Sequence, residues 1–258
     1  MSTNKRETRL HRLNGYQVNK IDYDKAILPV GATEYHGPHL PYGADGIAAE
    51  TIATAWANEL GKTLVLPTLY YGVSQHHMHW PWTLSLHGDT LSHIITEIGE
   101  SLISNGIWKL LVLSSHDGNH PAVGVAAHLL CERRGMNVAI FTGWQRKARS
   151  ILQNRLDVDL DHAGQSETSL ILYAAPETVN VDRITKQPSE PIDLPVQIVG
   201  KFELISPAGY SGNAANGTEE EGQTIINALT SHVVPFIRQL DRNGWKGGPW
   251  MSDAQDVK

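Results

Sequence analysis

The chain has 258 residues, enough for one large α/β domain with a hydrophobic core, and we predict a single domain over residues 1–258. Hydrophobic residues make up 41% of the sequence and charged residues 19%, a balance that excludes a disordered or fibrous chain. The formal net charge of -6 offers no general attraction to phosphate backbones or anionic lipids, so nucleic acid and membrane surfaces are excluded as expected partners.

Two features of the sequence bear on the compartment. The start, MSTNKRETRL, has no apolar stretch after its basic residues, and nowhere do about eighteen apolar residues run together, so we expect a soluble cytoplasmic protein. The single cysteine, Cys131, cannot form an internal disulfide. Because it lies in the apolar run AAHLLCERRG, it is predicted to be a helix packing residue rather than a nucleophile.

The first half of the chain alternates predicted strands and helices. Residues 25–31 (KAILPVG) form an apolar run that ends in glycine, which predicts a buried strand. Apolar residues spaced by four predict a helix over 46–60, and residues 64–67 (LVLP) are predicted to form a second strand. Asp89 or Thr90 can cap a further helix. Its apolar face follows the spacing of a helix through Leu91, Ile94, Ile95, Ile98 and Leu102.

The same alternation continues after this helix. Residues 110–113 are predicted to form a buried strand, and residues 138–142 (VAIFT) another. Between them, Asn119 followed by Pro121 predicts the start of a helix that ends at Gly135. Repeated strand–helix units predict an α/β fold, with a mostly parallel sheet and helices on both faces in three layers, because crossovers between parallel strands are right-handed.

The last part of the chain changes in composition. Residues from about 178 to 216 are rich in Pro, Gly, Ser and Asn and are predicted to be irregular. Thr218 and the glutamates that follow it form a capping box. A long helix is therefore predicted to close the domain, with an apolar face made of Ile225, Ile226, Leu229, Val233 and Ile237.

Polar residues that directly follow the predicted strands are candidates for function, because ligands of open parallel sheets bind beyond the carboxyl ends of the strands. Glu34 and His36 follow the first strand, and a spacing of two puts both side chains on one side of extended backbone. Asp45 comes soon after, just before a predicted helix, and His116 follows the strand at 110–113. Carboxylates and imidazoles in one cleft suit zinc or manganese, although E-x-H alone also arises by chance.

Two further polar segments leave alternatives open. In residues 159–169 (DLDHAGQSETS), an acidic run leads into a predicted helix. His162 fits a loop histidine as well as a functional one, and Glu167 fits a first-turn carboxylate favoured by the helix dipole. The histidines of residues 76–79 (HHMH) fit ordinary polar loop residues as well as residues that face a substrate.

Four ordered segments within residues 25–185 resemble the creatininase family, also called the creatinine amidohydrolase or creatininase/formamide hydrolase family. They are LPVGATEYHGPHLPYGAD, YYGVSQHHMHWPWTLSLHGDTL, LVLSSHDGN and DHAGQSETS. The resemblance implies a catalytic histidine at His162 and two divalent metal ions, with Zn²⁺ as the first expectation and Mn²⁺ or Fe²⁺ as alternatives. The metal ligands that it implies are Glu34, His36, Asp45, His116 and Glu167.

The resemblance also implies a reaction. Asp45 would bridge the two ions, a metal-activated water would attack the amide, and His162 would pass a proton to the leaving nitrogen. The expected substrate is a small cyclic amide or a formamide, cleaved at a non-peptide C–N bond, and the expected assembly is a homo-oligomer, a hexamer in the family pattern. The residues expected to face the substrate are Ser74, His79, Trp82, Asp117 and Trp144.

The chain departs from creatininase itself in three places. Creatininase has a tryptophan shortly before its catalytic histidine, whereas residues 158–161, before His162, contain no aromatic residue. Asp117 and Gly118 stand where creatininase has a tyrosine and a glutamate. The run WPWT at 80–83 stands where many members have Phe-Pro-Gly-Thr. The resemblance therefore does not identify the substrate.

Two other functions are weighed against hydrolysis. One is a non-catalytic member of the same family that only binds a small molecule, and metal content together with turnover would separate it from an enzyme. The other is a nucleotide-binding α/β protein. It is disfavoured because no glycine-rich phosphate loop follows the first strand.

Overall fold

The computed structural model describes residues 6–152, 162–185, 187, 200–204 and 206–245. Four strands form one sheet in the order β2-β1-β3-β4, and all three neighbouring pairs are parallel. In the centre of the sheet, β1 runs beside β3 with Ala26 opposite Leu110 and Val30 opposite Ser114. The strands are β1 (Lys25–Val30), β2 (Thr63–Val65), β3 (Lys109–Ser114) and β4 (Asn137–Phe141).

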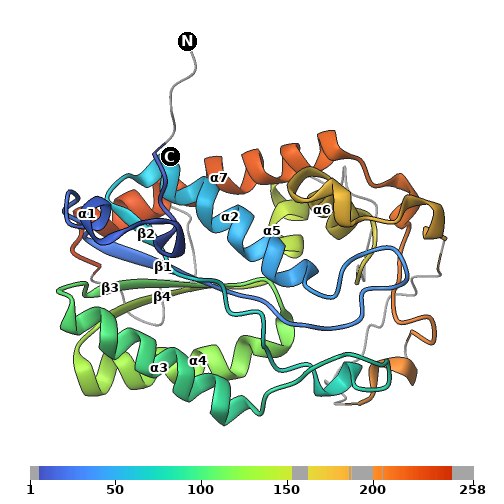
Figure 1. Ribbon diagram of the computed structural model, residues 1–258, viewed down its shortest axis with the longest axis horizontal. Coiled ribbons are helices and arrows are strands. Elements are labelled where there is room, and N and C mark those ends of the chain that lie inside the picture. The colour runs from blue at the N-terminus through green and yellow to red at the C-terminus, as the bar shows by residue number, and fades with distance from the viewer. Residues whose placement is uncertain (1–5, 153–161, 186, 188–199, 205, 246–258) are drawn as a thin grey trace.

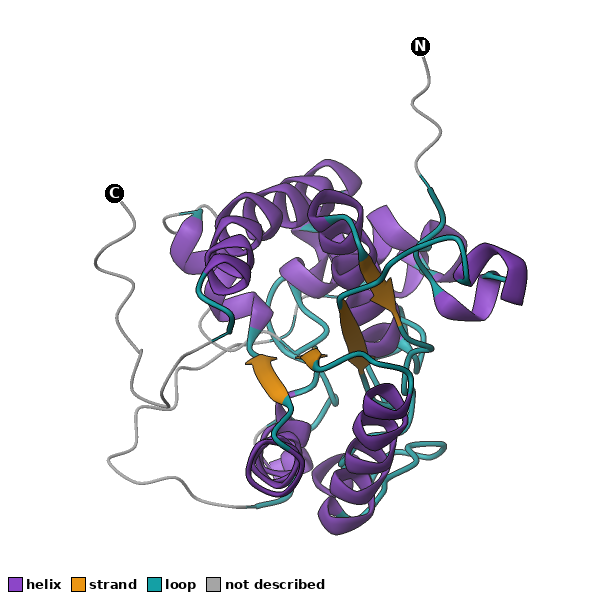
Figure 2. Ribbon diagram, turned by 90° about the vertical axis from the view of Figure 1, so that its left-hand side faces the viewer, coloured by secondary structure: helices purple, strands orange, loops and turns teal. Residues whose placement is uncertain are grey.

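Helices cover both faces of the sheet, which confirms the predicted three-layer α/β fold (Figure 1). On one face lie α3 (Gly88–Ser104) and α4 (His120–Arg134). The other face carries the remaining long helices, and Figure 2 shows the strands between the two groups. These helices are α2 (Ala44–Leu60), α5 (Trp144–Ile151), α6 (Gln165–Ala174) and α7 (Glu219–Arg242).

The central strand β1 supplies side chains to two hydrophobic cores. Ile27 packs with α2 and α7 in one core, whereas Ala26, Leu28 and Val30 pack with α3 and α4 in the other. This division follows from the strand geometry, in which successive side chains point to opposite faces. Since both faces are covered, all six residues of β1 are buried, as expected for a strand in the middle of a parallel sheet.

Most predicted helices are confirmed, with small shifts at their ends. The predicted apolar face of α3 is buried at Leu91, Ile95 and Leu102. Thr218 caps α7, because its side chain accepts a hydrogen bond from the backbone N–H of Glu221. Helix α2 begins two residues earlier than predicted, at Ala44, so Asp45 lies inside its first turn rather than before it.

The structure adds one helix that was not predicted and corrects one expectation. Helix α5 was not predicted, because it is short and polar apart from an inner face made by Trp144 and Ala148. Cys131 was predicted to pack inside α4 but is exposed. In that helix Val123, Ala126 and Leu130 face inward at helical spacing, and Cys131 lies one position beyond Leu130, about 100° around the axis.

The described parts of the predicted irregular segment form short 3-10 helices, whereas residues 188–199 and the acidic run 159–161 lie outside the described residues. The prediction of one domain over 1–258 also extends beyond them and stays a prediction. Among the described helices, none is long and apolar enough to cross a membrane. The short helices are η1 (Leu10–Arg12), α1 (Gly15–Val18), η2 (Gln75–His77), η3 (Asp117–Asn119), η4 (Pro176–Thr178), η5 (Val181–Arg183), η6 (Phe202–Leu204) and η7 (Ala214–Asn216).

Candidate metal centre

The loop after β1 and the first turn of α2 bring three acidic and imidazole side chains together. Glu34 and His36 lie in this loop and are each 1% exposed, and Asp45 is 3% exposed. The loop passes close to α2 at a point where only glycine fits. A Cβ atom added to Gly31 would lie 2.3 Å from the backbone nitrogen of Gly46, next to Asp45. The end of β1 is therefore packed directly against the first turn of α2, which carries Asp45.

His116 joins this cluster from the end of β3, the strand next to β1. Its Nδ1 lies 3.4 Å from Oε1 of Glu34 and 3.3 Å from Oδ2 of Asp45. Its Nε2 lies 2.9 Å from the carbonyl oxygen of Val73 and 3.4 Å from Oγ of Ser74. Because a carbonyl oxygen only accepts, Nε2 donates to Val73, and Nδ1 faces the two carboxylates.

The described residues form four overlapping groups of potential metal ligands, and Asp45 belongs to two of them. Each residue of a group offers one atom, and within each group these atoms lie within 4.8 Å of one another. Oδ1 of Asp45 lies 3.7 Å from Nε2 of His36, whereas Oδ2 faces His116. The first group is Glu34, Asp45 and His116, and the second is His36, Asp45 and Glu167.

Glu167 is held in place by two hydrogen bonds. It lies in the first turn of α6, as predicted, with Oε2 4.0 Å from Nε2 of His36. The side chain of Gln145 donates to Oε1 at 2.8 Å, and the backbone N–H of Ala163 donates to Oε2 at 2.5 Å. Ala163 itself has a positive φ of 55°, and its carbonyl oxygen accepts from Nε2 of His39 at 2.9 Å. The carboxylate is thus oriented before any ligand binds.

The donor atoms fit a divalent cation. Oε2 of Glu34 and Nε2 of His36 are buried, and neither has a hydrogen-bond partner among the described residues. A buried polar atom without a partner costs about 1–3 kcal/mol, so both positions favour a ligand that takes their lone pairs. Mixed carboxylate and imidazole donors are typical of Zn²⁺ and also suit Mn²⁺.

Charges in the cluster favour the ionised forms of Glu34 and Asp45. Burial alone would raise the pKa of Glu34, but the charge and hydrogen bond of His116, together with the charges of the other nearby histidines, hold this pKa well below its usual range. Burial would also lower the pKa of His36, whereas the carboxylates of Asp45 and Glu167 raise it to about 10. A cation that binds His36 must therefore displace a proton, so metal binding is expected to release protons.

His162 stands beside both groups with one nitrogen directed at them. Its Nε2 donates to the carbonyl oxygen of Tyr35 at 3.0 Å, and its Nδ1 lies 3.9 Å from Oε1 of Glu34. Its ring centroid lies 4.5 Å from that of His36. Burial and the nearby charge of His36 lower the pKa of His162 to about 4. The ring is therefore neutral near pH 7, and Nδ1 offers a lone pair for a proton.

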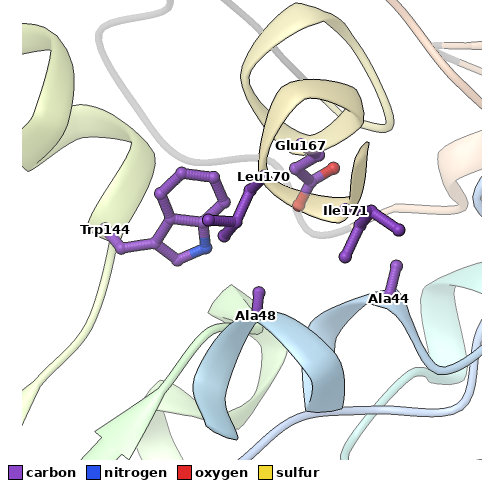
Figure 3. A pocket seen from close by; sticks show the side chains of 6 residues that line it. All are labelled: Ala44, Ala48, Trp144, Glu167, Leu170 and Ile171. Atoms are coloured by element: carbon purple, nitrogen blue, oxygen red, sulfur yellow. The ribbon is translucent and has the colours of Figure 1, made fainter. Parts of the chain in front are cut away.

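The five residues predicted to face a substrate lie in different surroundings. Ser74 is fully buried and contacts His116. Trp144 is also fully buried, in the core behind the centre, where it lines a small pocket together with Glu167 (Figure 3). The rest of that pocket is made of Ala44, Ala48, Leu170 and Ile171.

The other three residues of this set are exposed. Trp82 is 79% exposed and has a positive φ of 67°. His79 lies at the surface, 3.7 Å from a carboxylate oxygen of Glu203. Asp117 forms a two-point ion pair with Arg146, at 2.6 and 3.2 Å. Of these five residues, Ser74 contacts the candidate ligand His116 and Trp144 shares a small pocket with Glu167. The substrate-facing roles of all five stay predictions.

Sequence reasoning missed two residues near the centre, Gln145 and Phe202, and left a third, His77, undecided. Gln145 holds Glu167, but it lies in a helix that was not predicted. His77 is buried, in the run HHMH for which the sequence left open a surface loop or a loop facing the substrate. Phe202 packs against the rings of His77 and His162, at 4.4 and 5.1 Å between centroids. The spacing of Trp144, Ala148 and Ile151 was a signal for α5, whereas no signal in the sequence pointed to Phe202.

This fold and site define a class: a three-layer α/β protein with a buried carboxylate–imidazole cluster beyond the carboxyl ends of its central strands. Within that class, the family model for creatininase, described as creatinine amidohydrolase, matches residues 11–237. The chain therefore belongs to the creatininase family and is a hydrolase of the amidohydrolase type.

Curated relatives with different activities are similar to the chain over most of its length. It is 30% identical to a mycofactocin precursor peptide peptidase of Mycolicibacterium smegmatis, over 84% of this chain and 87% of that protein. It is 26% identical to a creatinine amidohydrolase of Pseudomonas putida, over 83% of this chain and 88% of that protein. Since one of these relatives is a peptidase, family membership does not choose between peptide and non-peptide bonds.

Solved structures agree with this assignment. A crystal structure of creatininase has a TM-score of 0.79 and 26% sequence identity, covering 90% of this chain and 97% of that chain. Creatininase has been solved in a Zn–Zn form and in a Mn form.

Proposed function

We propose that the protein is a metal-dependent amidohydrolase with a binuclear centre that cleaves the non-peptide C–N bond of a small cyclic amide or a formamide. One observation carries the proposal: the two carboxylate oxygens of Asp45 face different histidines, His36 and His116. A carboxylate in that position is suited to bridge two cations. The Zn–Zn and Mn forms of creatininase support Zn²⁺ or Mn²⁺ as the ions, with Fe²⁺ as a further alternative.

The protein side chains would divide the work of holding these ions. Glu34 and His116 would serve one ion, His36 and Glu167 the other, and Asp45 both. Divalent ions bound there would polarise a substrate carbonyl and lower the pKa of a water molecule towards neutrality. The fixed orientation of each ligand reduces the reorganisation that binding and reaction require.

His162 is proposed to move the proton. Its Nε2 is occupied by the carbonyl oxygen of Tyr35, so Nδ1 is the nitrogen available to the reacting groups. It would accept a proton from the attacking water and then give it to the leaving nitrogen. The lowered pKa of His162 supports this order, because the ring begins neutral and able to accept.

Access to the centre favours a small substrate. The five proposed ligands are each no more than 6% exposed. Phe202 lies against His162 on one side, and Tyr35 stacks on Trp80 with ring centroids 5.6 Å apart. Flat aromatic surfaces of this kind suit a planar amide or ring. The residues predicted to contact it, Ser74, His79, Trp82, Asp117 and Trp144, remain proposals.

A second candidate is hydrolysis of a peptide bond. It is supported by the 30% identity to the mycofactocin precursor peptide peptidase. The deep burial of the proposed ligands argues against a long peptide segment on both sides of the cleaved bond. We therefore place it second.

Elemental analysis of the purified protein, followed by a substrate screen, tests the proposal. We expect about two divalent ions per chain and turnover of at least one compound among creatinine, cyclic ureas, lactams and formamides. Short peptides in the same screen test the second candidate. A protein that holds two ions and binds a compound without releasing product would instead be the non-catalytic member. A protein without metal would contradict both hydrolysis candidates.

We also propose a homo-oligomer, and the family resemblance favours a hexamer. Two large apolar side chains, Trp82 and Leu204, are each 79% exposed in the single chain, and an interface would cover such residues. Light scattering of the purified protein tests this, since a hexamer has six times the mass of one chain. A mass equal to that of one chain at micromolar concentration would contradict the proposal.

A further inference from the structure

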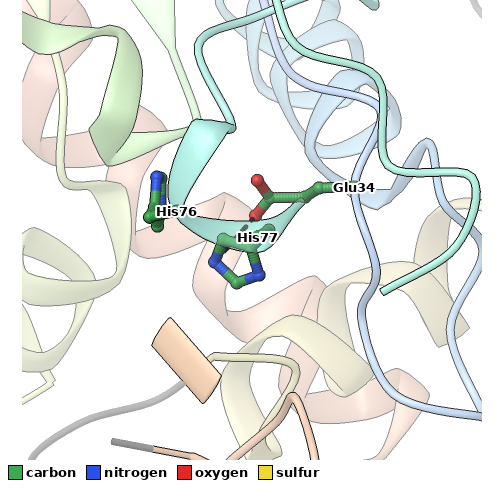
Figure 4. Close-up of side chains that lie close together, drawn as sticks. All are labelled: Glu34, His76 and His77. Atoms are coloured by element: carbon green, nitrogen blue, oxygen red, sulfur yellow. Dashed lines mark ion pairs between the residues drawn. The ribbon is translucent and has the colours of Figure 1, made fainter. Parts of the chain in front are cut away.

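Among the described residues, two more groups of potential metal ligands adjoin the two that share Asp45. One combines Glu34 and His36 with His162, and the other, the third group, is made with residues of η2. Glu34, His76 and His77 each offer one ligand atom, and these atoms lie within 4.8 Å of one another. The two histidines come from η2, whereas Glu34 comes from the loop after β1 (Figure 4). Among the proposed ligands of the binuclear centre, only Glu34 belongs to this group.

We propose that Glu34, His76 and His77 form a third divalent-cation site, weaker than the other two, whose occupation inhibits the enzyme. The binding part of this proposal stands on the geometry of the three residues. The inhibition part rests on the proposed hydrolase function.

The burial of His77 and its distance from Glu34 support the third site. His77 is 2% exposed, and its Nδ1 has no hydrogen-bond partner among the described residues. Its Nε2 lies 3.8 Å from Oε1 of Glu34, which is too long for a hydrogen bond. Two ligand atoms on one tetrahedral zinc ion lie about 3.4 Å apart, so a small shift would let one ion contact both residues.

His76 is placed to complete the group. Its ring lies edge-on to that of His77, with centroids 4.5 Å apart, and stacks on that of His116 at 5.5 Å. It therefore contacts His77 of the third group on one side and His116 of the first group on the other. A loop residue with no functional role would be expected to point into solvent, whereas His76 is only partly exposed and lies against the candidate centre.

The third ion is expected to bind more weakly than the first two because of charge. The cluster contains three carboxylates, those of Glu34, Asp45 and Glu167, which carry three negative charges in total. Two divalent ions already exceed that charge, and a third would meet net repulsion in a buried site. The third group adds only neutral imidazoles and must share the carboxylate of Glu34.

Sharing Glu34 gives the reason for inhibition. An ion held by His76 and His77 would draw this carboxylate away from the first group. It would also stand beside His162, whose ring centroid lies 4.5 Å from that of His77. Substrate and attacking water would then compete with the ion for the space next to the proton-transfer residue.

Equilibrium dialysis against Zn²⁺ at rising free concentrations, followed by elemental analysis, tests the site. The native protein is expected to hold two ions at low free Zn²⁺ and a third at higher concentration. The variants His76→Ala and His77→Ala are each expected to keep the first two ions and lose the third. His93→Ala removes an exposed histidine of α3 and serves as the matched control, which should bind as the native protein does.

Inhibition provides the second measurement, on a substrate found in the screen. Excess Zn²⁺ should inhibit the native protein, and the concentration for half-inhibition should rise by about tenfold or more in both variants, as expected when a group that supports the metal is removed. If His77→Ala fails to fold by circular dichroism, His76→Ala decides the question.

The outcomes separate the two proposals. Saturation of the native protein at two ions, or a third ion retained in the folded variants, would overturn the third site. A third ion that binds without inhibiting would overturn the inhibition part. A native protein that binds no ion tightly, or binds two ions and hydrolyses nothing, would instead refute the proposed function.

Discussion

Glu34 and His116 face each other across 3.4 Å and belong to the same group of potential ligands. We predict that Glu34→Gln and His116→Ala each leave the chain folded but remove metal and activity together, with a loss of rate of at least about 100-fold. Elemental analysis and an assay at saturating substrate measure both effects.

A surface variant separates this effect from a general effect of mutation. Glu100→Gln removes an exposed carboxylate of α3 that pairs with Arg134 at 2.7 Å. Glu100 is not among the proposed metal ligands. It should keep native metal content and rate. Full turnover of Glu34→Gln after metal removal would show that the assigned chemistry is wrong.

His162 is predicted to affect the rate and not the metal content. Its Nδ1 faces the cluster without belonging to the two groups that share Asp45. His162→Ala should therefore retain about two ions and lose roughly 10²–10⁴-fold in rate, the usual effect of removing a proton-transfer group. Metal analysis and single-turnover kinetics test this, and an unchanged rate would eliminate the role.

Gln145 is predicted to position Glu167 for its ion. Because its side chain donates to Oε1 of Glu167 at 2.8 Å, Gln145→Ala should weaken the affinity of the second group for metal by about 10–100-fold. Competition with a metal-binding dye measures this affinity. Gln223→Ala, an exposed glutamine of α7, is the control and should have no effect. Equal affinities in the two variants would contradict the positioning role.

The sequence predicted the proposed ligands but not the residues that support them. Glu34 and His36 follow a recognisable strand, and the motifs of a known family pick out the others. Their supports come from distant segments: Gln145 is 22 residues from Glu167, and Tyr35 is 127 residues from His162. Such contacts leave no local pattern, because they are set by packing between elements.

At the scale of elements, α6 and α7 depend on a close approach at Gly222. A Cβ atom there would lie 2.1 Å from the carbonyl oxygen of Ser169, on the backbone of α6. Gly222→Ala should therefore lower the free energy of unfolding by about 1–3 kcal/mol, because one helix must shift. Urea denaturation followed by circular dichroism measures the change.

Gly124 in α4 provides the matched control for this variant. A Cβ atom there meets nothing within 4 Å, so Gly124→Ala should stabilise the protein by about 0.5–1 kcal/mol through the helix propensity of alanine. A Gly222→Ala variant as stable as Gly124→Ala would contradict the close packing of α6 against α7.

Predictability differed between elements for a physical reason. Helices α3 and α7 have long apolar faces with helical spacing, so their existence follows from the sequence. Helix α5 has only two fully buried residues, and its polar composition resembles a loop. The start of α2 was missed by two residues because Gly43 provides no side-chain cap to mark it.

At the scale of the whole molecule, metal is predicted to stabilise the fold. Without metal, the charged imidazoles of His36 and His116 offset only part of the charge of three buried carboxylates, and divalent ions would compensate the rest. When free Zn²⁺ exceeds the dissociation constant of a site about 100-fold, the free energy of unfolding should rise by about 2.7 kcal/mol for each ion bound. Differential scanning fluorimetry with Zn²⁺ and with a chelator measures the resulting shift in Tm.

Glu34→Gln is the control for that experiment, because a variant that does not bind metal should have the same Tm in both solutions. A native protein whose Tm does not respond to the chelator would show that the cluster is stable without a cation.

Ala163 has a consequence for how this protein can diverge. Its left-handed backbone costs an alanine about 1–2 kcal/mol, and hydrogen bonds from its N–H and to its carbonyl hold it there. His162 precedes it directly, and Glu167 lies four residues later. An insertion or deletion in this single turn would displace both at once. Variation in substrate preference is therefore easier to accommodate in exposed stretches such as the one containing Trp82, where the chain can change without disturbing the chemistry.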